Sequence, residues 1–191
     1  MPHPRDDQGA RDLLKDLAAG KPEALGELYD RHAASLFRHA LALTRRRPEA
    51  EDLVHAVFVK LATTGAALID VRTPAHYLHR VLHTTWIDAE RRTFTGGRVV
   101  ESVATESYVL QSGGADAIDL ARALDDLPPA QREVIVLHLV EGFSFREVGR
   151  LTGVSLFTAA ARYRLAIGRM KTKLTRPAGL PQPVVPSKDD I

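Results

Sequence analysis

The chain has 191 residues, of which 45% are apolar and 26% charged, with a formal net charge of +2; this composition can build one globular domain or two small ones and excludes a disordered chain. The absence of cysteine excludes disulfides, zinc fingers and thiolate metal sites, and it fits a cytoplasmic location. The most apolar run, residues 134–140, is too short to cross a bilayer and the N-terminal residues lack the apolar core of a signal peptide, so we expect no membrane insertion.

Apolar residues recur at helical spacing along nearly the whole chain, and strand signals are almost absent, so we predict an all-α fold. Residues 1–21 are expected to be an N-terminal extension. Helices should then open near Pro22, Pro48 and Pro74, because proline suits the first turn of a helix. Together these helices form a predicted first domain, residues 22–92.

The helical periodicity fails over residues 93–115, where glycine pairs and several serines and threonines predict a flexible linker. Helical spacing resumes near Asp116, and residues 116–176 are expected to be a second small helical domain. Four prolines in residues 177–191 predict an extended tail without a core of its own. The predicted architecture is therefore two small helical domains joined by a linker.

The second domain contains a helix-turn-helix pattern in residues 144–166. Ser144 followed by Glu147 fits a capping box at the start of a short helix. Gly153 can take positive φ in the turn, and Ser155 is a good cap for a second helix of roughly 30 Å. The inward stripe of that helix is predicted to comprise Ala159, Tyr163, Ala166, Ile167, Met170 and Leu174.

Positive charge is concentrated on this pattern. Between Gly142 and Arg176 there are eight Lys/Arg side chains against one acidic residue, Glu147. Such a face can neutralise phosphates while the start of the second helix reaches base edges in the major groove. A solvated helix pair in an all-α protein that binds no DNA is the alternative interpretation.

Three blocks of this sequence resemble those of bacterial sigma factors of the extracytoplasmic-function type. AEDLVHAVF (residues 50–58) is similar to the family's helix that docks on core RNA polymerase. YLHRVLHTTWIDAERR (residues 77–92) resembles the helix that opens and holds the minus-ten promoter element. Residues 124–166 look like the module that reads the minus-thirty-five element.

The resemblance implies three sets of contact residues. Polymerase binding would involve Glu51, Asp52, His55 and Phe58. Minus-ten DNA binding would involve Tyr77, Arg80, Thr84, Trp86, Arg91 and Arg92, which offer aromatic, polar and basic groups for unstacked bases. Minus-thirty-five binding would involve Ser155, Phe157, Thr158, Ala161, Arg162 and Arg164. Purely structural roles remain open, because Tyr77 and Trp86 can be core aromatics, and Glu51 and Asp52 can simply compensate the helix dipole.

The sequence also departs from the family pattern. His55 and Ala56 replace a usual glutamine and acid, Thr84 replaces a frequent asparagine, and residues 157–162 read FTAAAR where GTVKSR is usual. Phe157, Ala161 and Leu165 therefore form an apolar row on the predicted DNA-facing side. One hypothesis is that this row contacts thymine methyl groups, and the other, which we favour, is that a partner or the first domain covers it.

Two other functions compete with that of a sigma factor. A helix-turn-helix regulator that never binds polymerase would not need residues 50–58. An enzyme would rest on His76, His79 and His83, whose spacing can hold a metal, but no HExxH motif, nucleophile triad or phosphate-binding glycine loop accompanies them. We therefore predict a non-enzymatic sigma factor with core RNA polymerase, promoter DNA and an anti-sigma factor as partners, and with no cofactor, metal site or small-molecule substrate.

Overall fold

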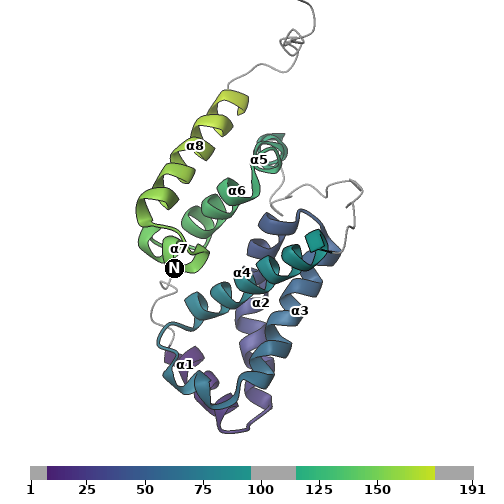
Figure 1. Cartoon of the computed structure of the whole chain (residues 1–191), viewed down its shortest axis with the longest axis vertical. Coiled ribbons are helices and arrows are strands. Elements are labelled where there is room, and N and C mark those ends of the chain that lie inside the picture. The colour runs from purple at the N-terminus through teal and green to yellow at the C-terminus, as the bar shows by residue number, and fades with distance from the viewer. Residues whose placement is uncertain (1–7, 96–114, 175–191) are drawn as a thin grey trace, which may run out of the picture.

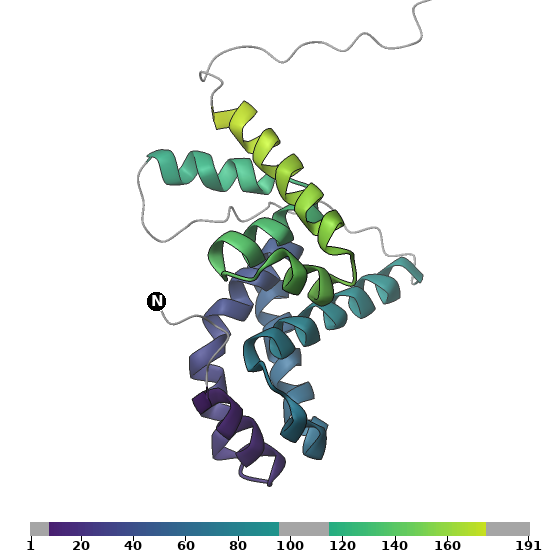
Figure 2. The same cartoon turned by 90° about the vertical axis from the view of Figure 1, so that its left-hand side faces the viewer.

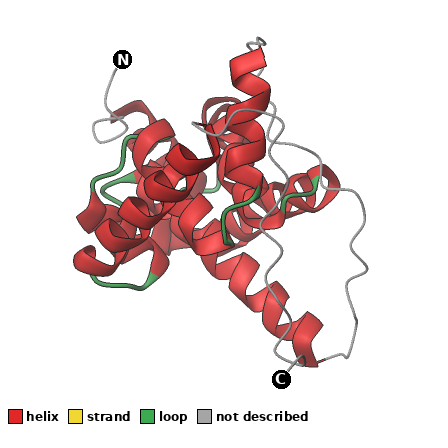
Figure 3. Cartoon of the chain, turned by 90° about the horizontal axis from the view of Figure 1, so that it is seen from above, coloured by secondary structure: helices red, strands yellow, loops and turns green. Residues whose placement is uncertain are grey.

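The computed structural model describes residues 8–95 and 115–174, and within them it consists of helices and connecting loops (Figure 3). The first group comprises α1 (Gln8–Ala18), α2 (Glu23–Thr44), α3 (Arg47–Thr64), the 3-10 helix η1 (Gly65–Asp70) and α4 (Pro74–Thr95). The second comprises α5 (Ala115–Asp125), α6 (Pro129–Ile135), a π-helical turn η2 (Val136–Val140), α7 (Phe145–Thr152) and α8 (Leu156–Leu174). We call α1–α4 the first domain and α5–α8 the second. The all-α prediction is confirmed.

The first domain is a bundle in which α2, α3 and α4 share one apolar core. Leu36, Val57 and Leu82, one from each helix, lie in this core and are at most 1% exposed. Helix α1, which lies inside the expected N-terminal extension, packs Ala10 and Leu14 into the same core. The extension therefore contributes a helix to the bundle.

Helix α3 and η1 together, Arg47–Asp70, are the one stretch of the described residues with the length and apolar composition of a membrane-spanning helix. One face of this stretch, including Leu53 and Leu61, is buried in the first domain, whereas Val59 and Ile69 are more than half exposed and Glu51 and Asp52 are exposed at its start. This is the pattern of a core helix in a bundle.

The second domain is built on two adjoining clusters. Helices α5, α6 and α8 meet around Leu124, Ile135 and Met170, and the helix-turn-helix closes over Val148 and Ala159. The inward stripe of α8 follows the prediction except at Leu174, which is 49% exposed because it belongs to the solvent-exposed last turn of the helix.

The two domains lie against each other, with α6 on α2 and α7 on α4 (Figures 1 and 2). Ala42 of α2 joins the apolar cluster of α5, α6 and α8, and Ala75 of α4 joins that of the helix-turn-helix. Most of the predicted linker, residues 93–115, and all of the predicted tail, residues 177–191, lie outside the described residues.

Candidate nucleic-acid interface

The turn between α7 and α8 has the predicted local chemistry. Ser144 Oγ accepts a hydrogen bond from Glu147 N at 3.4 Å, and Ser144 N donates to Glu147 Oε2 at 2.8 Å, which completes the capping box. Gly153 adopts φ 73°, and Thr158 N donates to Ser155 Oγ at 3.0 Å, which caps α8. Each feature depends on residues close in sequence, so the helix-turn-helix forms where predicted.

Gly149 allows α7 and α8 to come close together. A Cβ at this position would stand 2.7 Å from Val154 O and 3.2 Å from Leu156 N, both backbone atoms. The close approach fixes how the start of α8 projects beyond α7.

The outward side of α8 is apolar and basic together. Phe157 is 77% exposed and Leu165 is 58% exposed, while Ala161 between them is half-buried. Arg164 is exposed and Arg162 is half-buried, so both apolar and cationic groups reach this surface. The predicted apolar row is therefore open at its two ends and partly covered in its middle.

On α3, three of the four predicted polymerase contacts face outward. Glu51, Asp52 and His55 are exposed and line a hollow together with Phe37 and the half-exposed Tyr29. Phe58 lies elsewhere.

Phe58, the fourth residue of the predicted polymerase contacts, is buried beneath this hollow. The side chain is 5% exposed and packs against Tyr29 with 4.9 Å between the ring centroids. It belongs to the apolar face of α3, because it lies one turn after the buried Val54. Phe58 therefore supports the docking surface from within.

On α4, four of the predicted minus-ten residues share one face. Tyr77, Arg80, Thr84 and Arg91 follow helical spacing, and all except the half-buried Tyr77 are exposed. The Thr84 hydroxyl donates to Arg80 O at 3.1 Å and Val81 O at 3.0 Å, so its proton is engaged by the helix backbone.

The other two predicted minus-ten residues lie off this face. Trp86, nine positions after Tyr77, lies about half a turn round the helix and packs against the first-domain core beside His83. Arg92 is exposed near the C-terminal end and donates from Nε to Asp88 O at 3.1 Å.

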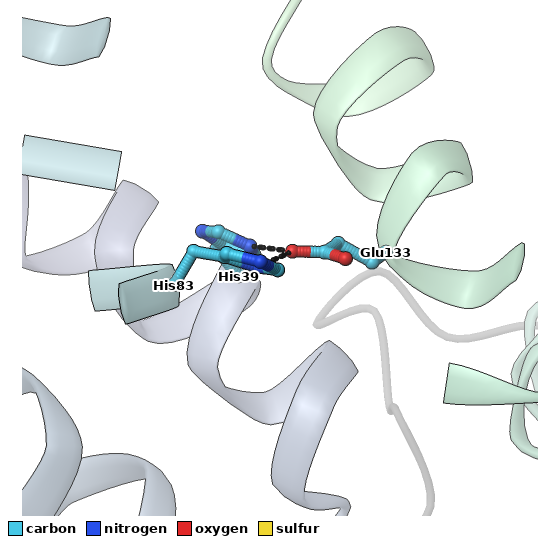
Figure 4. A group of neighbouring side chains, drawn as sticks. All are labelled: His39, His83 and Glu133. Atoms are coloured by element: carbon cyan, nitrogen blue, oxygen red, sulfur yellow. Dashed lines mark hydrogen bonds and ion pairs between the residues drawn. The ribbon is translucent and has the colours of Figure 1, made fainter. Parts of the chain in front are cut away.

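Sequence reasoning missed a polar cluster buried between the two domains. Glu133 of α6 is 2% exposed, and its Oε1 accepts hydrogen bonds from His39 Nε2 of α2 at 2.9 Å and His83 Nδ1 of α4 at 2.7 Å (Figure 4). Burial acts to raise the pKa of Glu133, but the hydrogen bonds from the two histidines outweigh it and lower that pKa to about 2. The carboxylate is therefore ionised.

A second row of hydrogen bonds continues from this cluster. His39 Nδ1 and His79 Nδ1 are 3.0 Å apart, and His79 Nε2 is 2.9 Å from Ser35 Oγ. Ser35 Oγ donates to Glu141 Oε2 at 2.5 Å, and Arg38 Nε donates to Glu141 Oε1 at 2.8 Å. Burial, followed by nearby His39, lowers the pKa of His79 well below 6.5, so this ring is neutral.

Arg132, next to Glu133, is also buried between the domains. Its guanidinium donates to the backbone carbonyls of Leu124 at 3.1 Å, Leu127 at 2.7 Å and Ala42 of the first domain at 2.7 Å. Burial lowers the pKa of Arg132 to about 10, so it remains charged at neutral pH. Leu124 and Leu127 precede Arg132 within the second domain, whereas the contact with Ala42 could not be predicted from spacing, because it forms only when the two domains pack together.

The predicted histidine trio of α4 does not converge on one point. His76 Nε2 lies 3.3 Å from Glu147 O, His79 faces His39 and Ser35, and His83 faces Glu133. All three therefore contact partners outside α4, and two of those partners belong to the second domain.

Comparison with known proteins identifies a family for each domain. The sequence model of Sigma-70 region 2 matches residues 28–93, and that of Sigma-70, region 4 matches residues 117–170. The ECF RNA polymerase sigma factor SigE of Mycolicibacterium smegmatis is 30% identical over 147 residues, covering 71% of this chain and 56% of that protein. The RNA polymerase sigma factor CarQ of Myxococcus xanthus is 29% identical over 167 residues, covering 81% of this chain and 90% of CarQ. The chain thus spans just over half of SigE and most of CarQ.

Two solved structures have a similar fold. The sigma factor RpoE in complex with the anti-sigma factor NepR from Bartonella quintana matches with a TM-score of 0.62 and 25% identity over 78% of this chain and 96% of RpoE. CnrH, in complex with the cytosolic domain of CnrY, matches with a TM-score of 0.62 and 23% identity over 87% of this chain and 97% of CnrH. The likeness to CnrH is one of fold alone.

Proposed function

The chain belongs to the sigma-70 family as a factor of the extracytoplasmic-function type, and from this premise we propose how its two domains share promoter recognition. The observation that carries the proposal is the presence of both region matches in order, residues 28–93 and 117–170. A DNA-binding regulator that acts without polymerase would need only the second. The sigma-factor function is therefore favoured over that alternative.

We propose that α3 docks on core RNA polymerase through Glu51, Asp52 and His55. Their exposure beside a hollow lined by Tyr29 and Phe37 supports this role, because a partner helix can place an apolar side chain there while its cations meet the carboxylates. Phe58 keeps α3 in position by packing beneath Tyr29.

Promoter DNA would be held at two places. The α4 face with Tyr77, Arg80, Thr84 and Arg91, extended by Arg92, would engage the melted minus-ten strand, where cations meet phosphates and the aromatic ring meets an unstacked base. Trp86 would act by packing, since it lies on another side of α4. The start of α8, from Ser155 to Arg164, would enter the major groove of the minus-thirty-five element.

The two domains must separate to do this. The two promoter elements are roughly 25 base pairs apart, which is about 85 Å of B-form DNA. In the arrangement described above, His76 of α4 is 3.3 Å from the carbonyl oxygen of Glu147 in α7. The twenty peptide units from Thr95 to Ala115 can extend to about 70 Å. Added to the dimensions of the two domains, this reach spans the distance between the promoter elements. The closed arrangement is therefore a resting state of the free factor.

The proposed mechanism is recruitment, with no catalytic chemistry supplied by this chain, and it would operate in the cytoplasm where polymerase and promoter meet. Linking two weak DNA contacts and one polymerase contact raises their combined affinity through effective concentration. An anti-sigma factor is the partner proposed for the silent state, on the precedent of RpoE with NepR.

Run-off transcription with purified core polymerase on a promoter library tests the proposal. The wild-type chain should yield specific transcripts, and the double charge reversal Glu51→Lys with Asp52→Lys should lower competition for core polymerase by about tenfold or more. Glu27→Lys, an exposed reversal on α2, is the matched control and should compete like the wild type. Core polymerase that initiates no differently with and without the chain would refute the proposal.

A further inference from the structure

The buried cluster between the domains has the composition of a metal site. His39 Nε2, His83 Nδ1 and a carboxylate oxygen of Glu133 all lie within 4.8 Å of one another (Figure 4). We propose that these three side chains bind one Zn²⁺ or similar transition-metal ion, which ties α2 and α4 of the first domain to α6 of the second. Two imidazole nitrogens and one carboxylate oxygen are a ligand set that zinc accepts, with a fourth position left for water.

The distances suit a site that needs only a small adjustment. Zinc ligands at about 2.0–2.2 Å from the ion stand roughly 3.4 Å from one another in a tetrahedron. The nitrogen–oxygen separations are 2.9 Å for His39 and 2.7 Å for His83. Moving the nitrogens of His39 and His83 away from Glu133 by about 0.5 Å and about 0.7 Å would bring these two separations to the tetrahedral value.

The neighbouring groups hold His39 in the tautomer that a metal requires. Ser35 gives its single hydroxyl proton to Glu141, so the 2.9 Å contact with His79 requires His79 Nε2 to be the donor. A His79 ring that donates from Nε2 accepts at Nδ1, so the 3.0 Å contact makes His39 Nδ1 the donor. An ion bound at His39 Nε2 would replace the hydrogen bond from this nitrogen to Glu133 and release its proton, while the Nδ1 proton stays directed at His79. Metal-bound histidines usually donate a hydrogen bond from the nitrogen that does not bind the metal, as His39 Nδ1 does to His79.

An ion can reach the site from the His83 side. The His83 side chain is 12% exposed, whereas those of His39 and Glu133 are 0% and 2% exposed. The single tryptophan of the chain, Trp86, lies beside His83 with 5.9 Å between the ring centroids. Occupation of the site can therefore be followed through tryptophan fluorescence.

The position of the site gives the ion a regulatory effect, and this consequence rests on the proposed function. All three ligands come together only when the domains are closed, so an ion that binds them stabilises the closed arrangement at the expense of the open one. Metal binding would oppose the separation that promoter engagement requires.

The test uses the full chain after treatment with chelator. Equilibrium dialysis should find one Zn²⁺ per chain, and Co²⁺ should produce the visible absorption of a low-coordinate site and quench Trp86, with both signals reversed by added Zn²⁺. His83→Gln should weaken binding by at least about tenfold, and His55→Gln, an exposed histidine on α3, should bind as the wild type does. A circular dichroism spectrum of each variant shows whether it is folded, so that weaker metal binding can be assigned to the lost ligand. Absence of binding at tens of micromolar Zn²⁺, or equal binding by the wild type and folded His83→Gln, would overturn the site.

Run-off transcription provides a second readout. Zn²⁺ should lower the yield with the wild type and spare His83→Gln; equal inhibition of both would overturn the regulatory effect. A metal-free chain that gives no transcripts at all would instead count against the proposed function, while the dialysis result would still decide the metal site.

Discussion

Glu141 should control how readily the two domains part, because it lies at the end of η2 and faces α2 of the first domain. Ser35 Oγ donates to its Oε2 at 2.5 Å, and Arg38 donates from Nε at 2.8 Å and from Nη2 at 3.2 Å. A hydrogen bond to a buried carboxylate contributes about 1.5 kcal/mol or more. The Arg38 side chain is 38% exposed, so solvent screens that ion pair and we assign it only about 0.5 kcal/mol. Glu141→Ala should therefore cost the closed arrangement about 2 kcal/mol, which is roughly a 30-fold change in the ratio of closed to open molecules.

Energy transfer between two dyes can measure this shift. The chain contains no cysteine, so one can be introduced at the exposed Glu27 of the first domain and another at the exposed Thr172 of the second without background labelling. Glu141→Ala should raise the low-transfer population, whereas Asp119→Ala, which removes an exposed acid from α5, should leave the distribution unchanged. Identical distributions for the two variants would refute the assignment of the closing contacts to Glu141.

Three further variants test the second domain. Gly149→Ala should destabilise the second domain by about 1–3 kcal/mol in urea unfolding, because the new Cβ would stand 2.7 Å from Val154 O. The control Gly168→Ala, which places a Cβ in open space on α8, should stabilise the domain by about 0.5–1 kcal/mol. Equal unfolding midpoints for the two variants would contradict the close approach of α7 and α8. Arg132→Met should lose about 3 kcal/mol in the same assay, since it removes the side-chain donor of the Ala42 and Leu127 carbonyls and one of the two donors of Leu124 O. An effect no larger than that of the exposed Arg150→Met would argue that these hydrogen bonds do not stabilise the fold. Phe157→Ser with Leu165→Ser should leave promoter binding by the polymerase complex within about threefold of wild type if a protein partner covers the apolar row; a tenfold loss would favour contact with thymine methyl groups.

The features that sequence predicted correctly are those whose causes are local. The helix-turn-helix follows from a capping box at Ser144, a left-handed glycine at position 153 and a cap at Ser155, each acting within four residues. Helical periodicity was wrong at Leu174, because it continues the inward stripe beyond the point where α8 is covered. The polymerase contact predicted for Phe58 comes from the family resemblance, whereas helical spacing places this side chain on the buried side of α3.

The interdomain cluster could not have been predicted from spacing. His39 and Glu133 are separated by 94 positions, and nothing in either local sequence favours the other. The spacing of three histidines on α4 suggests a metal site within that helix, but only His83 belongs to the group formed with His39 and Glu133. Contacts between side chains that are distant in sequence depend on the angles at which helices pack, and the whole core of each domain sets those angles.

The polar character of the interdomain contact explains why it can serve as a resting state. When the domains separate, exposing apolar surface to water is unfavourable, whereas buried charges and histidines regain hydrogen bonds to water. The first domain contributes the small side chains of Ala42 and Ala75 to the apolar clusters of the second domain. Glu133 and Glu141 accept the hydrogen bonds that cross between the domains. Rehydration of those groups offsets much of the interaction lost on opening, so modest binding energy from polymerase and DNA suffices to separate the domains. A metal ion on His39, His83 and Glu133 would reverse that balance, because its coordination bonds have no equivalent in the open molecule.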